Sequence, residues 1–464
     1  MTIMLRQDGR QGILPFVIVL GEREDITARA GLPLVVETAH ALGLAEEARK
    51  RLPVPRRQSD YGPDEKLDAL VTLIAAGGDR MEDVRILNED KGLLRLLGGP
   101  LPSPDALLDF LGEFHDETCW SERPKEKKAF VPPESANLQG LEGINNQLVK
   151  RGASGQTKVA TIDHDGTIIE SHKREALVAY EGTRGYQPLV AVWAEEELIV
   201  ADEFRDGNVA GGEDPLSSAK RAFVNLPSWV EERYFRGDSA SYYAPLLKYL
   251  VVEEIGFCIS ADMSKELREH CVELSEESWS ELEVREREKV DAAEVEFTPG
   301  DWPKEAKPLR YVALRFTPLQ GEMFDPPPPI RYHAVVSNRR ELSAAELIQW
   351  HRGKAGTIEH VHRVMKDELG AGVMPSQRFG ANAAWFRLNA ITFNLLTVLK
   401  RRALPERYRQ VRPKRLRFEV FTIPGKLVHH QSRLSVSISA DGERMQEIVT
   451  ARQNLLQMLE ASGS

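Results

Sequence analysis

Residues 159–169 read VATIDHDGTII, a mostly apolar run that leads into two acidic residues and a Gly-Thr pair. The apolar residues predict a buried strand, and the Gly-Thr pair predicts a turn directly after it. Asp163 and Asp165 would then lie at the end of a strand, where their oxygens can bind a hard metal ion such as Mg²⁺. A plain Asx turn, in which the carboxylates bond only the local backbone, is the alternative without a function.

The segments after this stretch predict the topology of the sheet. Residues 187–193 and 197–204 are apolar-rich and three residues apart, a link that allows only an antiparallel hairpin. Next come a helical pattern, a strand, a second helix and a strand, over residues 214–226, 232–235, 243–252 and 255–260. This order predicts a mixed α/β fold with an RNase H-like core. The first and fourth strands of such a core are neighbours, so Asp165 can meet Asp238 although 73 positions separate them.

The composition is that of a soluble globular protein. The chain has 464 residues, of which 42% are hydrophobic and 28% charged, and its length suggests about two to four domains. No apolar run approaches the ~20 residues that a membrane span needs, so we expect no membrane association. The three cysteines, Cys119, Cys258 and Cys271, have no CxxC spacing. They argue against a disulfide framework or a zinc site and for a reducing cytoplasm.

The charges are sorted along the chain. The net charge of −10 by itself argues against nucleic-acid binding. Residues 331–417, however, contain 18 Lys and Arg and only 6 Asp and Glu. Nine of these basic residues fall within residues 400–417. Residues 262–305 hold 15 acidic and 6 basic residues. Any single run of like charges is explained by a solvated face of the protein. The separation of basic from acidic runs, however, favours one surface that binds a polyanion beside another that does not.

The composition divides the chain into five regions. A helical N-terminal region, with a helix start at Ser103-Pro104, suits a DNA-binding domain as well as a plain helical bundle. The core is interrupted by an acidic, mainly β insertion, and a basic region with a β hairpin and a terminal helix follows it, suited to DNA binding or dimerisation. The predicted regions are residues 1–152 (N-terminal), 153–261 (core, first part), 262–338 (insertion), 339–400 (core, helical second part) and 401–464 (C-terminal).

Two helices are predicted in the second part of the core. The first covers residues 344–352 and ends near Gly353 and Gly356, because glycine weakens helices. The second covers residues 357–369.

One face of the second helix combines a carboxylate with cations. At helical spacing this face carries Glu359, then Arg363 or His362, and then Lys366. A metal ligand followed by groups that hold phosphate fits this row. A surface ladder of salt bridges fits it equally.

Several blocks in a fixed order resemble one protein family. They are DHDGT at 163–167, ESHK at 170–173, YEGTRGY at 180–186, EFRDGN at 203–208, RGDS at 236–239 and GTIE at 356–359. Together they resemble the DDE transposases of bacterial insertion sequences, in the branch with a group-one DDE domain, and within it the insertion-sequence 1380 family. The resemblance extends over nearly the whole chain.

The resemblance implies the catalytic residues. Asp165, Asp238 and Glu359 would be the three catalytic carboxylates and would hold Mg²⁺, for which Mn²⁺ can substitute. Asp163 is a supporting neighbour, since the wider family favours the second acid of this motif.

The helix motif of the related transposases is only half present. They carry Tyr-x2-Arg-x3-Glu-x6-Lys around the last carboxylate, and Glu359 and Lys366 keep the final spacing. The Tyr position is Arg352 and the Arg position is Ala355. Arg352 and Lys354 are the candidates to supply the missing cation, and Arg363 is a further supporting cation.

The resemblance implies double-stranded DNA as the partner, both the terminal inverted repeats and the target, with a homodimer that joins both ends. The candidate DNA-binding residues are Lys366, Lys400, Arg401, Arg402, Arg412, Lys414, Arg415 and Arg417. One alternative is a catalytically inactive, transposase-derived DNA-binding protein. A second is a haloacid-dehalogenase-type phosphatase using Asp163 and Asp165, whose DxDGT signature is matched. The predicted hairpin weakens it, because that fold needs parallel strands with helical crossovers.

Overall fold

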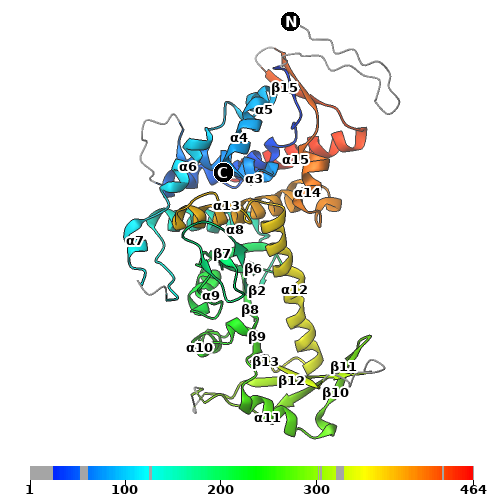
Figure 1. Ribbon diagram of the computed structural model, residues 1–464. Coiled ribbons are helices and arrows are strands. Elements are labelled where there is room, and N and C mark those ends of the chain that lie inside the picture. Colours follow the sequence, from blue (N-terminus) through cyan, green and yellow to red (C-terminus); the bar gives the residue numbers. More distant parts are fainter. Residues whose placement is uncertain are drawn as a thin grey trace, which may run out of the picture.

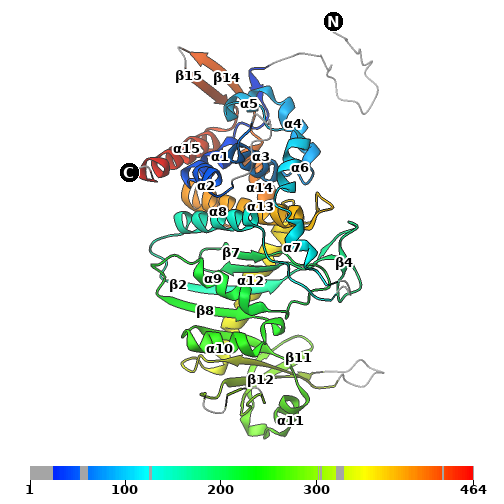
Figure 2. The ribbon, with the colours of Figure 1, turned by 90° about the vertical axis from the view of Figure 1, so that its left-hand side faces the viewer.

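The computed structural model describes residues 24–52, 61–124, 128–300, 302–303, 306–319, 329–430 and 433–462. It contains one large mixed sheet below a helical domain, with long helices between them (Figures 1 and 2). Of the helices in these ranges, none is long and apolar enough to cross a membrane.

The N-terminal region is helical where the structure describes it. Its helices are α1 (Pro33–Ala41), α2 (Leu44–Arg51), α3 (Pro63–Ala76), α4 (Val84–Glu89), α5 (Lys91–Leu97), α6 (Pro104–Gly112), α7 (Glu117–Ser121) and α8 (Ala136–Gly152). The predicted start at Ser103 is present, because its hydroxyl accepts a hydrogen bond from the Ala106 amide at 3.2 Å. The first 23 residues lie outside the described ranges.

The centre of the sheet has the predicted topology. Its strands are β2 (Val159–Gly166), β6 (Leu189–Trp193), β7 (Leu198–Glu203), β8 (Glu232–Gly237) and β9 (Gly256–Ala261). They lie in the order β7-β6-β2-β8-β9, with β6 antiparallel and β8 parallel to β2. Helices α9 (Pro215–Val224) and α10 (Ala244–Val252) make the crossovers between β7, β8 and β9. The prediction of an RNase H-like core is confirmed, and the antiparallel β6 disagrees with a dehalogenase-type parallel sheet.

The acidic region extends the same sheet. After α11 (Lys265–Glu273) come β10 (Ser280–Val284), β11 (Glu288–Val295), β12 (Arg310–Pro318) and β13 (Arg331–Ser337). All neighbours in this part are antiparallel, and β13 pairs with β9. The predicted insertion is therefore mainly β, but its strands continue the core sheet to nine strands.

The region after the sheet contains two long helices. The prediction of a break at Gly353 and Gly356 is wrong, because α12 (Ala344–Asp367) runs through both glycines. A Cβ at position 353 would lie 2.5 Å from Nη1 of Arg236, so this glycine lets the helix pack closely on the sheet. Every residue of α13 (Phe379–Val398) is buried, and this helix lies with α8 between the sheet and the helical domain (Figure 1).

The C-terminal region joins the helical domain. The predicted hairpin is present as β14 (Gly425–His430) and β15 (Arg433–Ile438), and β14 also pairs with β1 (Ile26–Thr27). The terminal helix α15 (Gly442–Ser462) packs against α1. Both ends of the described chain thus belong to one domain (Figure 1).

Candidate active site

The ends of β2 and β8 bring two carboxylates to one cleft. Asp165 is the last but one residue of β2, and Asp238 directly follows β8. The two strands are parallel neighbours, so their carboxyl ends meet at one edge of the sheet. Both residues line a cleft of about 880 Å³. The predicted meeting of the first and fourth strands therefore takes place.

The electrostatics of the cleft favour a cation. Burial, and then the negative charge of Asp165, raise the pKa of Asp238 above its ordinary value. The Lys354 ammonium donates a hydrogen bond to Oδ2 of Asp165 at 2.9 Å and offsets part of this repulsion. A divalent ion between two hard carboxylates would relieve the rest.

These two carboxylates suit Mg²⁺, which protein side chains and substrate phosphates bind together, better than a metal ion whose ligands all come from the protein. Within the described ranges, no group of three His, Cys, Asp or Glu side chains is arranged to hold an ion. Mg²⁺ usually keeps several waters and is bound by one or two carboxylates together with phosphates of the substrate. Two acidic side chains that line an open cleft match that pattern.

The two acids of the DHDGT motif have different surroundings. Asp163 is completely buried, and its Oδ1 and Oδ2 accept hydrogen bonds from Nε and Nη2 of Arg236 at 2.6 and 2.8 Å. The Thr357 hydroxyl also donates to Asp163. Asp165 is the acid that faces the cleft. A phosphatase site needs both carboxylates free, and here the first is occupied.

Helix α12 delivers its predicted site residues to different places. Lys366 lines the cleft, with Nζ 3.5 Å from the Ile168 carbonyl oxygen, and Lys354 reaches Asp165. Glu359 is exposed and does not line the cleft. The structure thus brings together Asp165, Asp238, Lys354 and Lys366, and leaves Glu359 on the neighbouring surface of the helix.

The other cations predicted on α12 also lie outside the cleft. Arg352 pairs with Glu283 at 3.0 Å, and Arg363 is exposed. His362, the alternative to Arg363 in the row, is buried. Burial lowers the pKa of His362 to about 4, although the Asp165 charge acts against it, so this imidazole is neutral at pH 7.

Some cleft residues were not predicted as site residues, although Tyr180 and Glu181 belong to the YEGTRGY block. Asp262 directly follows β9, and Tyr180 and Glu181 lie in the turn after β4 (Leu177–Val178). An acid near the end of a predicted strand is the signal that identified Asp165, and Asp262 lies two positions after the strand predicted at 255–260.

Much of the basic segment 400–417 is engaged within the protein. Lys400 is buried and donates to the Val411 carbonyl, and Arg417 donates to the Ala75 carbonyl at 2.9 Å. Arg401 pairs with Glu196 at 3.1 Å. These three cations are poorly placed to bind phosphate. The side chains of the segment that remain exposed, among those predicted to bind DNA, are Arg402, Arg412, Lys414 and Arg415.

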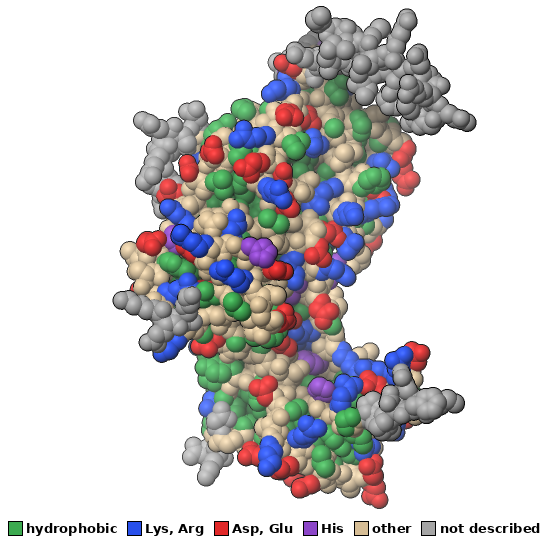
Figure 3. Space-filling view, viewed as in Figure 1, with side chains coloured by type: hydrophobic (Ala, Val, Ile, Leu, Met, Phe, Trp, Pro, Cys, Tyr) green, Lys and Arg blue, Asp and Glu red, His purple; other side chains and the backbone are tan. Residues whose placement is uncertain are grey.

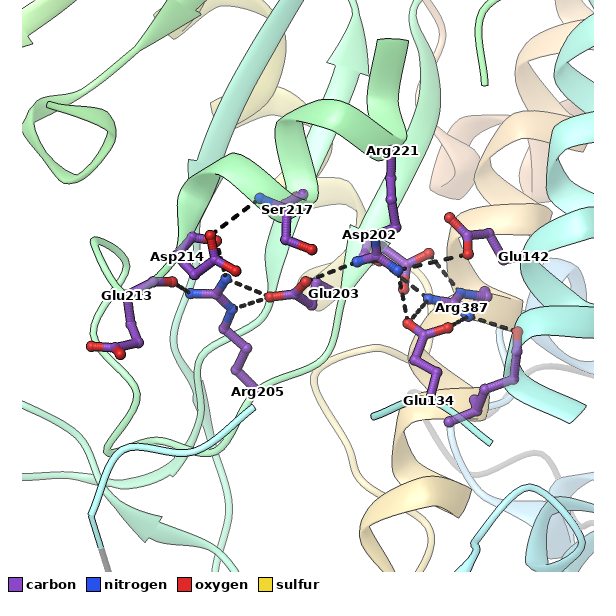
Figure 4. A network of polar contacts seen from close by, with 12 residues as sticks. Glu134, Glu142, Asp202, Glu203, Arg205, Glu213, Asp214, Ser217, Arg221 and Arg387 are labelled. Carbon is purple, nitrogen blue, oxygen red and sulfur yellow. Dashed lines mark hydrogen bonds and ion pairs between the residues drawn. The ribbon is translucent and has the colours of Figure 1, made fainter. Parts of the chain in front are cut away.

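A second polar cluster lies away from the cleft, where the core meets the helices (Figure 4). Arg387 on α13 is buried and donates to Glu134 at 2.8 and 2.9 Å and to Asp202 on β7 at 2.9 Å. Arg221 on α9 pairs with Glu134 and Glu203, both at 3.0 Å. Burial acts to raise the pKa of Glu134, but the two guanidiniums outweigh it and hold the pKa at about 2. The cluster connects α9, β7 and α13.

Comparison with known proteins identifies a family. Residues 17–460 match the family model described as transposase DDE domain group 1. No curated protein matches the chain. Among solved structures, the chain is similar to a piggyBac transposase in the cryo-EM structure of its synaptic complex with hairpin DNA, at 12% sequence identity and a TM-score of 0.49. That alignment covers 85% of this chain and 80% of that one.

Proposed function

The chain belongs to the transposase DDE domain family of group 1, and from this membership we propose that it cleaves DNA at the ends of an insertion sequence and joins them to a target. The observation that carries the proposal is the meeting of Asp165 and Asp238 in one cleft at the ends of β2 and β8. Assignment to the insertion-sequence 1380 family stays a prediction.

Asp165 and Asp238 would hold the metal in a two-metal reaction. Bound Mg²⁺, or Mn²⁺ in its place, supplies Lewis-acid stabilisation of charge on the phosphate oxygens and lowers the pKa of an attacking water. Asp238 must be ionised to bind it, so the charge repulsion at Asp238 is relieved when the cofactor binds. Cleavage and joining use the same residues, because the nucleophile is a water in one step and a DNA 3′-hydroxyl in the other.

Two lysines supply positive charge to the same cleft. Lys354 holds Asp165 in place through its 2.9 Å contact, and Lys366 presents its ammonium at the cleft wall. Lys366 would bind a phosphate oxygen near the scissile bond. Glu359 would join the two aspartates as third carboxylate once DNA and metal are bound, since it is carried by the same helix.

The proposed DNA-binding surface combines α12 with the exposed basic side chains. Figure 3 shows a hollow beside the middle of the molecule, where α12 lies in Figure 1. Arg412, Lys414 and Arg415 are exposed in the segment that follows α13. We propose that a homodimer brings two DNA ends together.

Nicking of a plasmid that carries the terminal repeats tests the proposal. The native protein should nick it with Mg²⁺ and not with EDTA, and Asp238→Asn should abolish nicking while the protein still binds the ends. Asp367→Asn is the matched control, because Asp367 is an exposed acid on α12 outside the cleft. If Asp238→Asn nicks as the native protein does, the cleft is not the active site.

A non-catalytic DNA-binding protein is the second candidate. One observation favours it, namely that Glu359 lies outside the cleft. Specific binding of the terminal repeats by a native protein that never nicks them, with either Mg²⁺ or Mn²⁺, would establish it.

A further inference from the structure

Arg236, on β8, contacts two other elements that carry the proposed site, β2 and α12. Its guanidinium forms the two hydrogen bonds to Asp163 on β2, at 2.6 and 2.8 Å, and Nη1 donates to the Trp350 carbonyl on α12 at 2.7 Å. It also lies over the Trp350 ring, 5.4 Å from the centroid. Both Arg236 and Asp163 are buried. Bidentate pairs of this kind fix direction as well as distance.

The register of the strands places this pair directly behind the carboxylates. Asp163 and Arg236 are opposite each other in the parallel β2–β8 ladder. Asp165 follows Asp163 by two residues on β2, and Asp238 follows Arg236 by two residues, directly after the end of β8. Residues two apart on a strand share a face, so a shift of the Asp163–Arg236 pair is expected to displace Asp165 on β2.

Helix α12 is shaped to receive the guanidinium. At Gly353 a Cβ would lie 2.5 Å from Nη1 of Arg236, so a larger residue would push the helix and the arginine apart. Thr357, one turn later, donates to Asp163. Lys354, which lies between Gly353 and Thr357, donates a hydrogen bond to Asp165. Glu359 lies two residues after Thr357.

From these contacts we propose that Arg236 is a positioning residue, which with Asp163 and Gly353 fixes α12 against the ends of β2 and β8 and so sets the metal-binding geometry of the cleft. The first acid of the DHDGT motif then orients the site through Arg236 rather than binding metal. This inference rests on the proposed function. Groups that orient metal ligands in this way typically account for roughly 10–100-fold in metal affinity or activity.

Two substitutions separate positioning from plain stability. Arg236→Lys keeps the charge but loses the bidentate geometry. Gly353→Ala improves helix propensity, so a purely local effect would stabilise α12, whereas its methyl group should displace the guanidinium. The matched control is Arg387→Lys, which disrupts an equally buried pair between Arg387 on α13 and Asp202 on β7 (Figure 4).

The experiment measures Mn²⁺ binding by calorimetry without DNA, and Mg²⁺-dependent nicking, at a temperature where circular dichroism shows every variant folded. Positioning predicts that Arg236→Lys and Gly353→Ala weaken Mn²⁺ binding by at least about tenfold and raise the half-saturating Mg²⁺ for nicking, while Arg387→Lys does neither. Native-like Mn²⁺ binding in both variants, or an equal loss in Arg387→Lys, overturns it. If the native protein binds Mn²⁺ but never nicks DNA, and both variants lose Mn²⁺ binding, positioning is supported and the transposase activity is rejected.

Discussion

The pKa of Glu134 predicts how much the ion cluster in Figure 4 contributes to the free energy of unfolding. The carboxyl is held at a pKa of about 2 against an ordinary value of 4.5. The folded protein thus favours the ionised form, and the stability this contributes is present above pH 4.5 and is lost as pH falls through 2. The shift corresponds to about 3 kcal/mol at pH 7, since one pKa unit is ~1.4 kcal/mol.

The perturbation is Glu134→Gln, which keeps the shape and removes the charge. By linkage, the free energy of unfolding of the native protein should exceed that of the variant by about 3 kcal/mol at pH 7 and by about 2 kcal/mol at pH 3.5, where Glu134 of the unfolded chain is largely protonated. Urea unfolding followed by tryptophan fluorescence at the two pH values measures both differences.

The control is Glu37→Gln, which disrupts the exposed pair with Arg452. Such a surface pair is worth less than about 1 kcal/mol, so its unfolding midpoint should hardly change. If Glu134→Gln is as stable as the native protein at pH 7, or if the difference in unfolding free energy does not decrease at pH 3.5, the ionised Glu134 does not stabilise the core.

Three further outcomes are expected. Without metal, Asp238→Asn should raise the melting temperature at pH 7. The raised pKa of Asp238 means that the folded state disfavours its ionised form, so the stability that protonation contributes is lost as pH rises. A lower melting temperature of the variant would contradict this. Replacing Arg412, Lys414 and Arg415 together with Gln should lower the slope of log affinity against log salt by up to about three units, whereas Arg417→Gln should leave that slope unchanged and lower the melting temperature. Chelation by EDTA should stop nicking but leave binding of the terminal repeats intact, as a gel-shift assay can check.

Local patterns predicted the elements that depend on neighbours in sequence. The apolar run before Asp163, the short link between β6 and β7 and the cap at Ser103 each specify a structure within a few residues. The topology of the core followed from their order, and so did the meeting of Asp165 with Asp238.

Features that depend on distant partners could not be predicted in this way. Gly353 was predicted to end a helix, but it lies inside α12, where a Cβ would come 2.5 Å from the guanidinium of Arg236, more than 100 positions away. Helical spacing placed Glu359 and Lys366 on related faces, yet only the packing of α12 on the sheet decides which of them reaches the cleft. Charge counts likewise did not reveal that Lys400 is buried.

Fe²⁺-directed cleavage of the polypeptide tests directly whether metal binds between Asp165 and Asp238. Fe²⁺ in place of Mg²⁺, with ascorbate and peroxide, cuts the backbone next to the ion. If metal binds between these carboxylates, cuts should appear close to residues 165 and 238. Excess Mg²⁺ should suppress these cuts, and Asp238→Asn should remove them. Cuts confined to other parts of the chain, or cuts that persist in Asp238→Asn, would contradict it.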